Sequence, residues 1–394
     1  MLLKLLELSG CNRVRKIFFL IVCFFFLSAY PIYKNYINGE AIATYQLYRG
    51  VIEKRSKFYN PWQYRILCPL IIEGTKRLYD VTIDKIFPIE KNFSSGFRST
   101  SGFASSTEIF IQQLKDPNVL KYLIIFICFR FFEDFVILVL AYFLLKYFIK
   151  SRWLILTGLI LISWSMGNGV SASDLTFNTY LDNILYLLAG CIILYRQNPW
   201  YILPITIIGC ANRETSLLIP YLFFVSNLQF KYPVLSKNMF TGMRFPSRKV
   251  FIITSISFIS FALIFIGIRA YFGYQPQGIW KVPAGLPMLK LNLFSVVAVK
   301  GYFEMFGAFS IIPLICIYKF RQCSEILQLW FVVIVPIWFL VHFYSVPSYE
   351  SRLFFVPTYL IFIPMLLEII QKYEGRGNKL ENKNSVPTML NIPE

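Results

Sequence analysis

The sequence predicts an all-α protein that crosses a membrane in about ten passes, and three observations lead to this fold class. Of the 394 residues, 56% are hydrophobic and only 15% are charged, whereas soluble globular proteins carry about 25% charged residues. The mean hydropathy is +0.57. Apolar runs of near-spanning length recur along most of the chain, and a helix needs about 20 apolar residues to cross a bilayer. We therefore expect one polytopic domain, residues 17–370.

The first apolar run, residues 17–33, follows Arg13, Arg15 and Lys16 and has the flanks of a signal peptide. It lacks a small-residue cleavage site, because Pro31 breaks the pattern, and further apolar runs follow it. We expect an uncleaved signal anchor that leaves the basic residues 1–16 in the cytoplasm. The other expected full spans are residues 119–147, 153–168, 179–195, 250–272, 294–318, 325–343 and 353–370.

The segment 200–228 is apolar but is interrupted by the polar residues 212–215. Its two parts hold about 11 and 14 residues, or about 16 and 21 Å of helix, less than a hydrocarbon core of about 30 Å. We expect a short broken hairpin with an outward tip. This topology puts 19 Lys and Arg in cytoplasmic segments and five on short external loops, in agreement with the positive-inside rule. Both termini are then cytoplasmic, with 371–394 a disordered tail.

The long loop 34–118 is the one candidate subdomain, and we expect it on the extracytoplasmic side. Two stretches, 41–56 and 64–79, are expected to be helices that lie on the membrane surface. Apolar residues of the first stretch recur at three- and four-residue spacing, namely Ile42, Tyr45, Tyr48 and Ile52.

The net charge of +18 is explained by cytoplasmic loops and by anionic headgroups of the membrane lipids, so nucleic acid is not an expected partner. His342 is the single histidine, which excludes a zinc site built from several histidines. We expect no metal and no cofactor. Most of the eight cysteines lie inside apolar runs, and no disulfide framework is visible.

Acidic residues are scarce, so those expected near the outer face are candidates for function. Glu40 follows the first span and starts the first surface helix. Partial desolvation at the lipid–water boundary would make its carboxylate a better general base. The alternative is a helix-start residue that the helix macrodipole favours.

Arg65 stands next to Tyr64 in the long loop. It could bind a phosphate group bidentately, or its side chain could simply snorkel to the interface.

Asp174 and Asp182 are separated by about two helical turns. They could line a sugar-sized pocket, or Asp174 could merely cap the start of a helix.

Arg213 and Glu214 interrupt the broken hairpin and are the most specific feature of the sequence. A helix that begins inside the membrane zone presents free N–H groups, which bind phosphate, and broken helices often mark binding sites. Neighbouring residues are about 100° apart on a helix, so each needs a different partner or a ligand. The alternative is a set of salt bridges between helices that only holds the hairpin in place.

Glu350 and Arg352 flank one residue at the mouth of the last span, and an extended segment would let both reach one cavity.

This order of features resembles the C-type (GT-C) superfamily of integral-membrane glycosyltransferases, loosely and over most of residues 17–370. An acidic residue and a tyrosine follow the first span, a Gly-Pro-aromatic stretch leads into a surface helix, a broken hairpin carries a charged tip, and an acid-x-Arg pair opens the last helix. The residues that carry the resemblance are Glu40, Tyr45, Gly50, Pro61, Tyr64, Arg65, Pro69, Arg213, Glu214, Glu350 and Arg352.

The resemblance implies a GT-C-like fold and the transfer of a sugar from a polyprenyl-phosphate donor to an extracytoplasmic glycan, lipid or protein acceptor. It implies that Glu40 is the catalytic base and that Arg213 and Arg352 hold the donor phosphate. The chain departs from the superfamily pattern at the catalytic position of the first loop, because many members carry aspartate or an Asp-Glu pair where this chain has the single glutamate Glu40. We expect a bacterial inner membrane, or the endoplasmic reticulum membrane in a eukaryote.

Two other functions fit the same features. A polymerase or ligase of lipid-linked polysaccharide would consume a preassembled glycan on a lipid diphosphate. A transporter or flippase for a lipid-linked or anionic substrate would also use buried charges and a broken helix.

Overall fold

The computed structural model describes residues 11–35, 40–58, 60–88, 92, 112, 115–169, 177–275 and 282–384. Within these ranges the chain is helical and forms no strand, apart from a single bridge between Gln229 and Arg244. The predicted all-α class is thereby confirmed. Side chains of a few helix-end residues, including Glu40, lie outside the described part.

The helices are α2 (Cys11–Asn35), α3 (Glu40–Ile52), α4 (Leu67–Val81), α7 (Pro117–Phe148), α8 (Arg152–Asn168), α9 (Phe177–Leu194), α10 (Ile202–Asn212), α11 (Leu218–Ser226), α12 (Arg248–Phe272), α13 (Leu286–Phe294), α14 (Val296–Phe309), α15 (Ile312–Tyr318), α16 (Glu325–Ser345), α17 (Phe355–Pro357) and α18 (Ile363–Asn384). Short turns that shape the site lie between them, namely η1 (Trp62–Tyr64), η5 (Glu214–Leu217), η7 (Ser351–Phe354) and the π-helical η8 (Thr358–Phe362).

In the described part of the chain, four helical segments are long and apolar enough to cross a membrane, as an integral membrane protein requires. They are Ile17–Lys34, Arg248–Phe272, Glu325–Ser345 and Ser351–Glu374. A fifth span is possible only if α13 and α14 count as one, although they are bent by 71°. The ten expected passes therefore include helices that are too short or too charged to count as membrane-spanning segments by themselves.

Helix α7 is long enough, since its 32 residues extend about 48 Å. Its middle, however, buries Arg130, Glu133 and Asp134. Within the described residues, the carboxylate oxygens of Glu133 and Asp134 accept no hydrogen bond. The Arg130 guanidinium instead lies 5.9 Å from the ring centre of Tyr180 on α9. An arginine placed N-terminal to a carboxylate is the less favourable order for an ion pair along a helix.

The expected single span 294–318 is wrong in detail, because the chain breaks twice. Ser295 ends α13 and caps α14, with its hydroxyl accepting from the Ala298 amide at 3.1 Å. Ser310 has a φ of 54°, in the left-handed region, and separates α14 from α15. Serine is favoured at an N-cap such as position 295, because its hydroxyl accepts from a free amide of the first turn, whereas the left-handed backbone at Ser310 is one that glycine adopts more readily.

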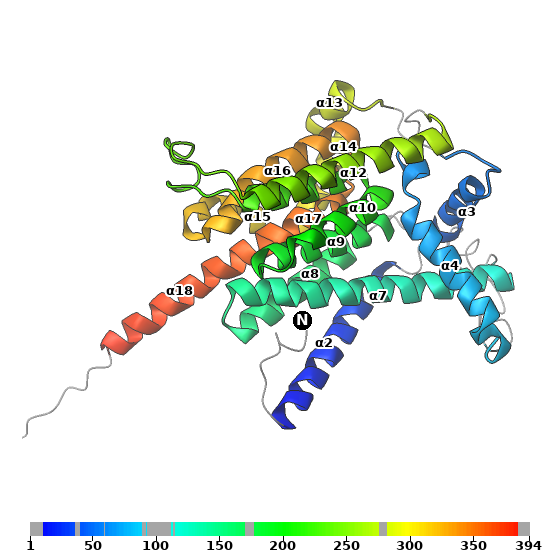
Figure 1. The fold of residues 1–394 in the computed structure, drawn as a ribbon. Coiled ribbons are helices and arrows are strands. Elements are labelled where there is room, and N and C mark those ends of the chain that lie inside the picture. Colours follow the sequence, from blue (N-terminus) through cyan, green and yellow to red (C-terminus); the bar gives the residue numbers. More distant parts are fainter. Residues whose placement is uncertain are drawn as a thin grey trace, which may run out of the picture.

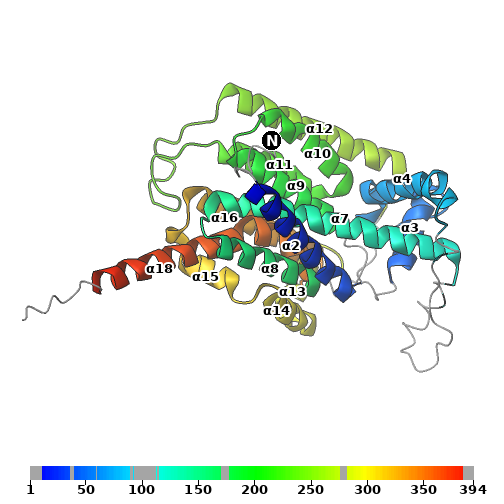
Figure 2. The same cartoon turned by 90° about the horizontal axis from the view of Figure 1, so that it is seen from below.

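The α3 and α4 helices lie at one end of the bundle, beside the start of α7 (Figures 1 and 2). Their predicted existence is confirmed, but the apolar face of α3 packs on protein. Tyr45 is buried against Tyr122 and Phe126 of α7, and Tyr48 is buried against Phe58. The α3 helix is thus part of the protein core and does not rest on lipid through these two side chains.

The basic connection 227–247 and the C-terminal part of α18 both lie at the opposite end of the bundle (Figures 1 and 2). The bundle therefore separates the first-loop helices from this basic connection. Helix α18 extends to Asn384, beyond residue 370 where the last span was expected to end and into the segment expected to be a tail. An ion pair one turn apart, between Lys372 and Glu368, supports this continuation.

Candidate functional site

One cavity of about 230 Å³ opens where six chain segments meet: η1, the start of α9, the break after α10, the end of α12, the end of α16 and η7. Four arginines and two glutamates line it, together with His342. These charged residues are Arg65, Arg213, Arg269, Arg352, Glu214 and Glu350. The charged lining therefore carries a formal excess of two positive charges, which favours an anionic ligand.

The break in the hairpin sets the directions of Arg213 and Glu214. Helix α10 ends at Asn212, Arg213 has an extended backbone with φ −155° and ψ 148°, and η5 begins at Glu214. Because consecutive side chains of an extended segment point in opposite directions, the two charges cannot meet each other. They pair with different partners.

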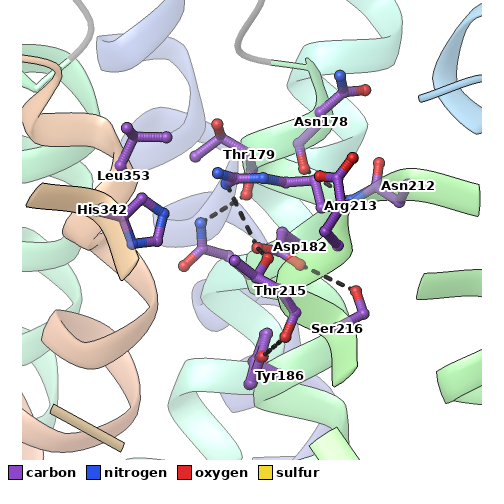
Figure 3. A network of polar contacts seen from close by, with 12 residues as sticks. Asn178, Thr179, Asp182, Tyr186, Asn212, Arg213, Thr215, Ser216, His342 and Leu353 are labelled. Atoms are coloured by element: carbon purple, nitrogen blue, oxygen red, sulfur yellow. Dashed lines mark hydrogen bonds and ion pairs between the residues drawn. The ribbon is translucent and has the colours of Figure 1, made fainter. Parts of the chain in front are cut away.

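Arg213 pairs with Asp182, which lies on α9 (Figure 3). Its Nη1 is 3.4 Å from Asp182 Oδ2, and both side chains are almost fully buried. The hydroxyls of Thr215 and Ser216 also donate to this carboxylate, at 3.1 and 3.4 Å. Asp182 is thus satisfied from three sides and holds the broken hairpin against α9.

Glu214 accepts from two arginines that come from distant parts of the chain. Arg65 reaches its Oε2 through Nη2 at 2.9 Å and Nε at 3.3 Å, and Arg269 Nη2 reaches its Oε1 at 3.3 Å. The Arg269 guanidinium also lies 4.4 Å from the ring centre of Tyr64. One carboxylate therefore sets the spacing of two cations at the cavity wall.

The turn η1 brings Arg65 to this place because it is anchored on the end of α12. Gln63 Nε2 donates to the Phe272 carbonyl at 3.1 Å, and the Tyr64 hydroxyl donates to the Gly273 carbonyl at 2.9 Å. Gly273 has a φ of 72° and ends α12 there, a conformation that glycine adopts without strain.

Arg352 retains unused hydrogen-bonding capacity. Its Nη2 pairs with Glu350 Oε2 at 2.8 Å. Its Nε and Nη1 are buried and have no hydrogen-bond partner among the described residues, and the same holds for Arg213 Nε. Buried donors without partners cost free energy, about 1–3 kcal/mol for each group. A bound oxyanion would satisfy these donors, because a guanidinium matches the geometry of phosphate.

His342 is buried beside the cavity, and its ring stacks on Trp338 with centroids 5.1 Å apart. Its Nδ1 lies 2.8 Å from the Trp338 carbonyl oxygen. A carbonyl oxygen only accepts, so Nδ1 carries the proton and Nε2 of the neutral ring remains free to accept. A ligand hydroxyl in the cavity could donate to Nε2.

Five of the eight residues predicted to form the site line this cavity, namely Arg65, Arg213, Glu214, Glu350 and Arg352. Asp182 lies behind Arg213 and positions it. Asp174 lies outside the described residues, and Glu40 is the first residue of α3 but its side chain is also outside them. Across the described ranges, no three His, Cys, Asp or Glu side chains come together as metal ligands.

The sequence analysis did not include Arg269, which lies inside the expected span 250–272, or His342 among the candidate site residues. A signal was available for Arg269, because it lies four residues before Gly273, at the end of a long apolar helix. A cation at the end of a spanning helix is expected near the membrane surface, where its side chain can contact residues of the connecting loops.

No protein-family model matches the chain, and no curated protein and no solved structure matches it either. The function must therefore be argued from the cavity itself.

Proposed function

We propose that this cavity binds the phosphate of a polyprenyl-phosphate-linked sugar and that the protein is a membrane glycosyltransferase of the GT-C type. In this proposal the chain makes about ten passes, with the short helices α8–α11 among them, and both termini are cytoplasmic. The observation that carries the proposal is the unused hydrogen-bonding capacity of Arg352 and Arg213 in a cavity with excess positive charge.

The reaction would run as an inverting displacement. A carboxylate, assigned to Glu40, takes the proton of an acceptor hydroxyl, and the acceptor oxygen forms a bond to the anomeric carbon of the sugar. The bond between that carbon and the phosphate oxygen breaks, and polyprenyl phosphate leaves with the electron pair. Arg213 and Arg352 stabilise the charge that grows on the leaving phosphate.

The size of the cavity supports a single sugar phosphate over a preassembled glycan. Its volume is about 230 Å³, below the range of about 300–1,000 Å³ that is usual for pockets of drug-sized ligands. A cavity of this volume also gives no support to the alternative function of a transporter with a wide substrate path.

The test uses the full chain in lipid nanodiscs with a panel of polyprenyl-monophosphate hexoses and pentoses. Wild-type protein with a suitable acceptor should release polyprenyl phosphate, detected by mass spectrometry. Arg352→Gln should lower the rate about 100-fold or more, because it removes charge stabilisation from the transition state. The matched control is Arg321→Gln, the same change at an exposed site outside the cavity.

Two outcomes would contradict the proposal. Release of polyprenyl diphosphate from a lipid-diphosphate glycan, with no use of monophosphate donors, would identify a polymerase or ligase. Movement of the lipid-linked sugar across sealed liposomes without covalent change would identify a flippase. Glu40→Gln tests the base separately, since transfer at the wild-type rate would show that another group takes the proton.

A further inference from the structure

A second cavity, with a volume of about 460 Å³, lies between α3, α4 and the start of α7, away from the arginine cavity. Its wall mixes both charge signs with amides, phenols and apolar groups. Its charged lining residues are Arg49, Lys76, Arg77, Glu73 and Asp116, and the phenols belong to Tyr45 and Tyr122. Glu73 stands six residues beyond the start of α4, so about 9 Å of helix separates it from the end near Arg65.

Glu73 is held in one orientation by two hydroxyl donors and one nearby guanidinium, all at a single oxygen. The hydroxyls of Tyr45 and Tyr122 donate to Oε1 at 2.6 and 2.9 Å, and Arg49 Nε lies 3.4 Å from the same oxygen. Burial and the hydrogen bond to Glu73 raise the pKa of the Tyr45 phenol, so it remains a donor. Oε2 accepts no hydrogen bond from any described residue and is left as a positioned acceptor.

Among the described residues, the cations of this second cavity are matched in number by carboxylates. Three cations line it, the exposed Arg77 among them, together with the carboxylates of Glu73 and Asp116, and two further carboxylates pair with the other two cations. Arg49 pairs with Glu53 at 3.1 Å as well as with Glu73, and Lys76 pairs with Asp80 at 2.6 Å. Both cations also lie near the face of the Tyr122 ring, at 5.4 and 5.5 Å. A phosphate ligand would have to compete with these carboxylates, so the lining favours a neutral ligand with many hydrogen-bonding groups.

Two amide side chains complete the polar wall. Gln46 on α3 and Asn118 on α7 both line the cavity and are exposed. An amide presents a donor and an acceptor side by side, which matches neighbouring hydroxyl groups on a sugar ring. Val119 and Phe126 add apolar surface on the α7 side. Polar planar side chains around a small apolar area suit a hydroxyl-rich molecule better than a lipid tail.

We propose that the cavity between α3, α4 and α7 binds a neutral saccharide, with the free oxygen of Glu73 and the amides of Gln46 and Asn118 accepting from and donating to its hydroxyls. Binding at this cavity does not require the arginine cavity. The further step, that this saccharide is part of the acceptor glycan, rests on the proposed transferase function.

The experiment applies fluorescently labelled full chain in nanodiscs to an array of neutral and acidic oligosaccharides, followed by titration of the strongest neutral oligosaccharide. Glu73→Gln should weaken binding about tenfold, which corresponds to about 1.4 kcal/mol. Gln46→Ala should weaken it about threefold and leaves the Glu73 contacts in place. Glu53→Gln is the matched control, because Glu53 also pairs with Arg49 but does not line the cavity.

Failure of this inference and failure of the proposed function are distinguishable. Arg352→Gln should leave neutral saccharide binding unchanged while it lowers sugar transfer. If no neutral oligosaccharide binds, or if Glu53→Gln weakens binding as much as Glu73→Gln, the saccharide site is refuted whatever the transfer assay gives. If Glu73→Gln protein does not fold, as judged by its melting temperature, an unchanged affinity in Gln46→Ala protein refutes the site.

Discussion

The guanidinium of Arg213 lies 3.4 Å from the carboxylate of Asp182, and both side chains are almost completely shielded from solvent. This pair joins the break in the α10–α11 hairpin to the N-terminal half of α9. Ionised groups in such a place are costly unless they are paired and hydrogen-bonded. The pair therefore holds the backbone that presents Arg213 and Glu214 to the cavity.

Asp182→Asn should destabilise the protein by about 3–5 kcal/mol, since it leaves the buried Arg213 charge without its partner. The amide keeps the size of the side chain but has a single acceptor oxygen, so it can accept from Thr215 or from Ser216 and not from both, and the loss combines the missing charge with one missing acceptor. The measurement is the unfolding transition in detergent. Glu325→Gln, at an exposed helix start, should change stability by less than about 0.5 kcal/mol. An equal effect of the two substitutions would contradict the prediction.

Arg65 and Glu214 should be energetically coupled across about 150 residues of sequence. Hydrogen bonds to charged groups contribute about 1.5–3 kcal/mol, and the partial exposure of Glu214, at 31%, places the coupling at the lower end. A double-mutant cycle with Arg65→Gln and Glu214→Gln measures it from unfolding free energies. Additive effects of the two substitutions would mean that the pair does not form.

His342→Phe separates packing from hydrogen bonding at the cavity wall. A phenyl ring should keep the stacking on Trp338, so the melting temperature should stay close to that of the wild type. It removes the free Nε2 acceptor, and sugar transfer should fall about tenfold if a ligand hydroxyl donates there, because one hydrogen bond contributes about 0.5–1.5 kcal/mol. His342→Asn serves as the comparison, since it keeps polar atoms and loses the stacking.

The α3–α4 end and the 227–247 connection should lie on opposite sides of the membrane, because they lie at opposite ends of the bundle (Figure 1). Arg55→Cys and Ser236→Cys place a thiol at each end. A membrane-impermeant maleimide added to right-side-out vesicles should label the first thiol, and lysis should be needed to label the second. Wild-type vesicles supply the background from native cysteines. Labelling of both thiols in intact vesicles would contradict this topology.

The charged tip of the hairpin could be predicted because Arg213 and Glu214 interrupt an apolar run, a pattern visible along the sequence. A shared site for Arg213 and Arg352 was implied by the resemblance to the GT-C superfamily, whereas the place of Arg65 was left open between a phosphate contact and the membrane interface. The partners themselves could not be predicted. Glu214 bonds to Arg269 because α12 ends beside η1, and helix packing of this kind leaves no local pattern.

Two fold features show the same limit. The breaks at Ser295 and Ser310 lie within an apolar stretch, where hydropathy alone indicates one continuous span. The apolar side of α3 could equally face lipid or protein, since both surroundings select the same residues. This side of α3 faces protein because it packs on Tyr122 and Phe126. Both residues belong to α7, a helix that starts about 70 residues later in the chain.

The cavity draws its cations from before α4 and from after α16, so Arg65 and Arg352 belong to opposite ends of the bundled chain. Any contiguous fragment that retains all four arginines must contain residues 65–352, which is most of the protein. A premature stop anywhere before η7 removes Arg352, even if every preceding helix still inserts. No contiguous fragment shorter than residues 65–352 can therefore carry all four arginines of the cavity.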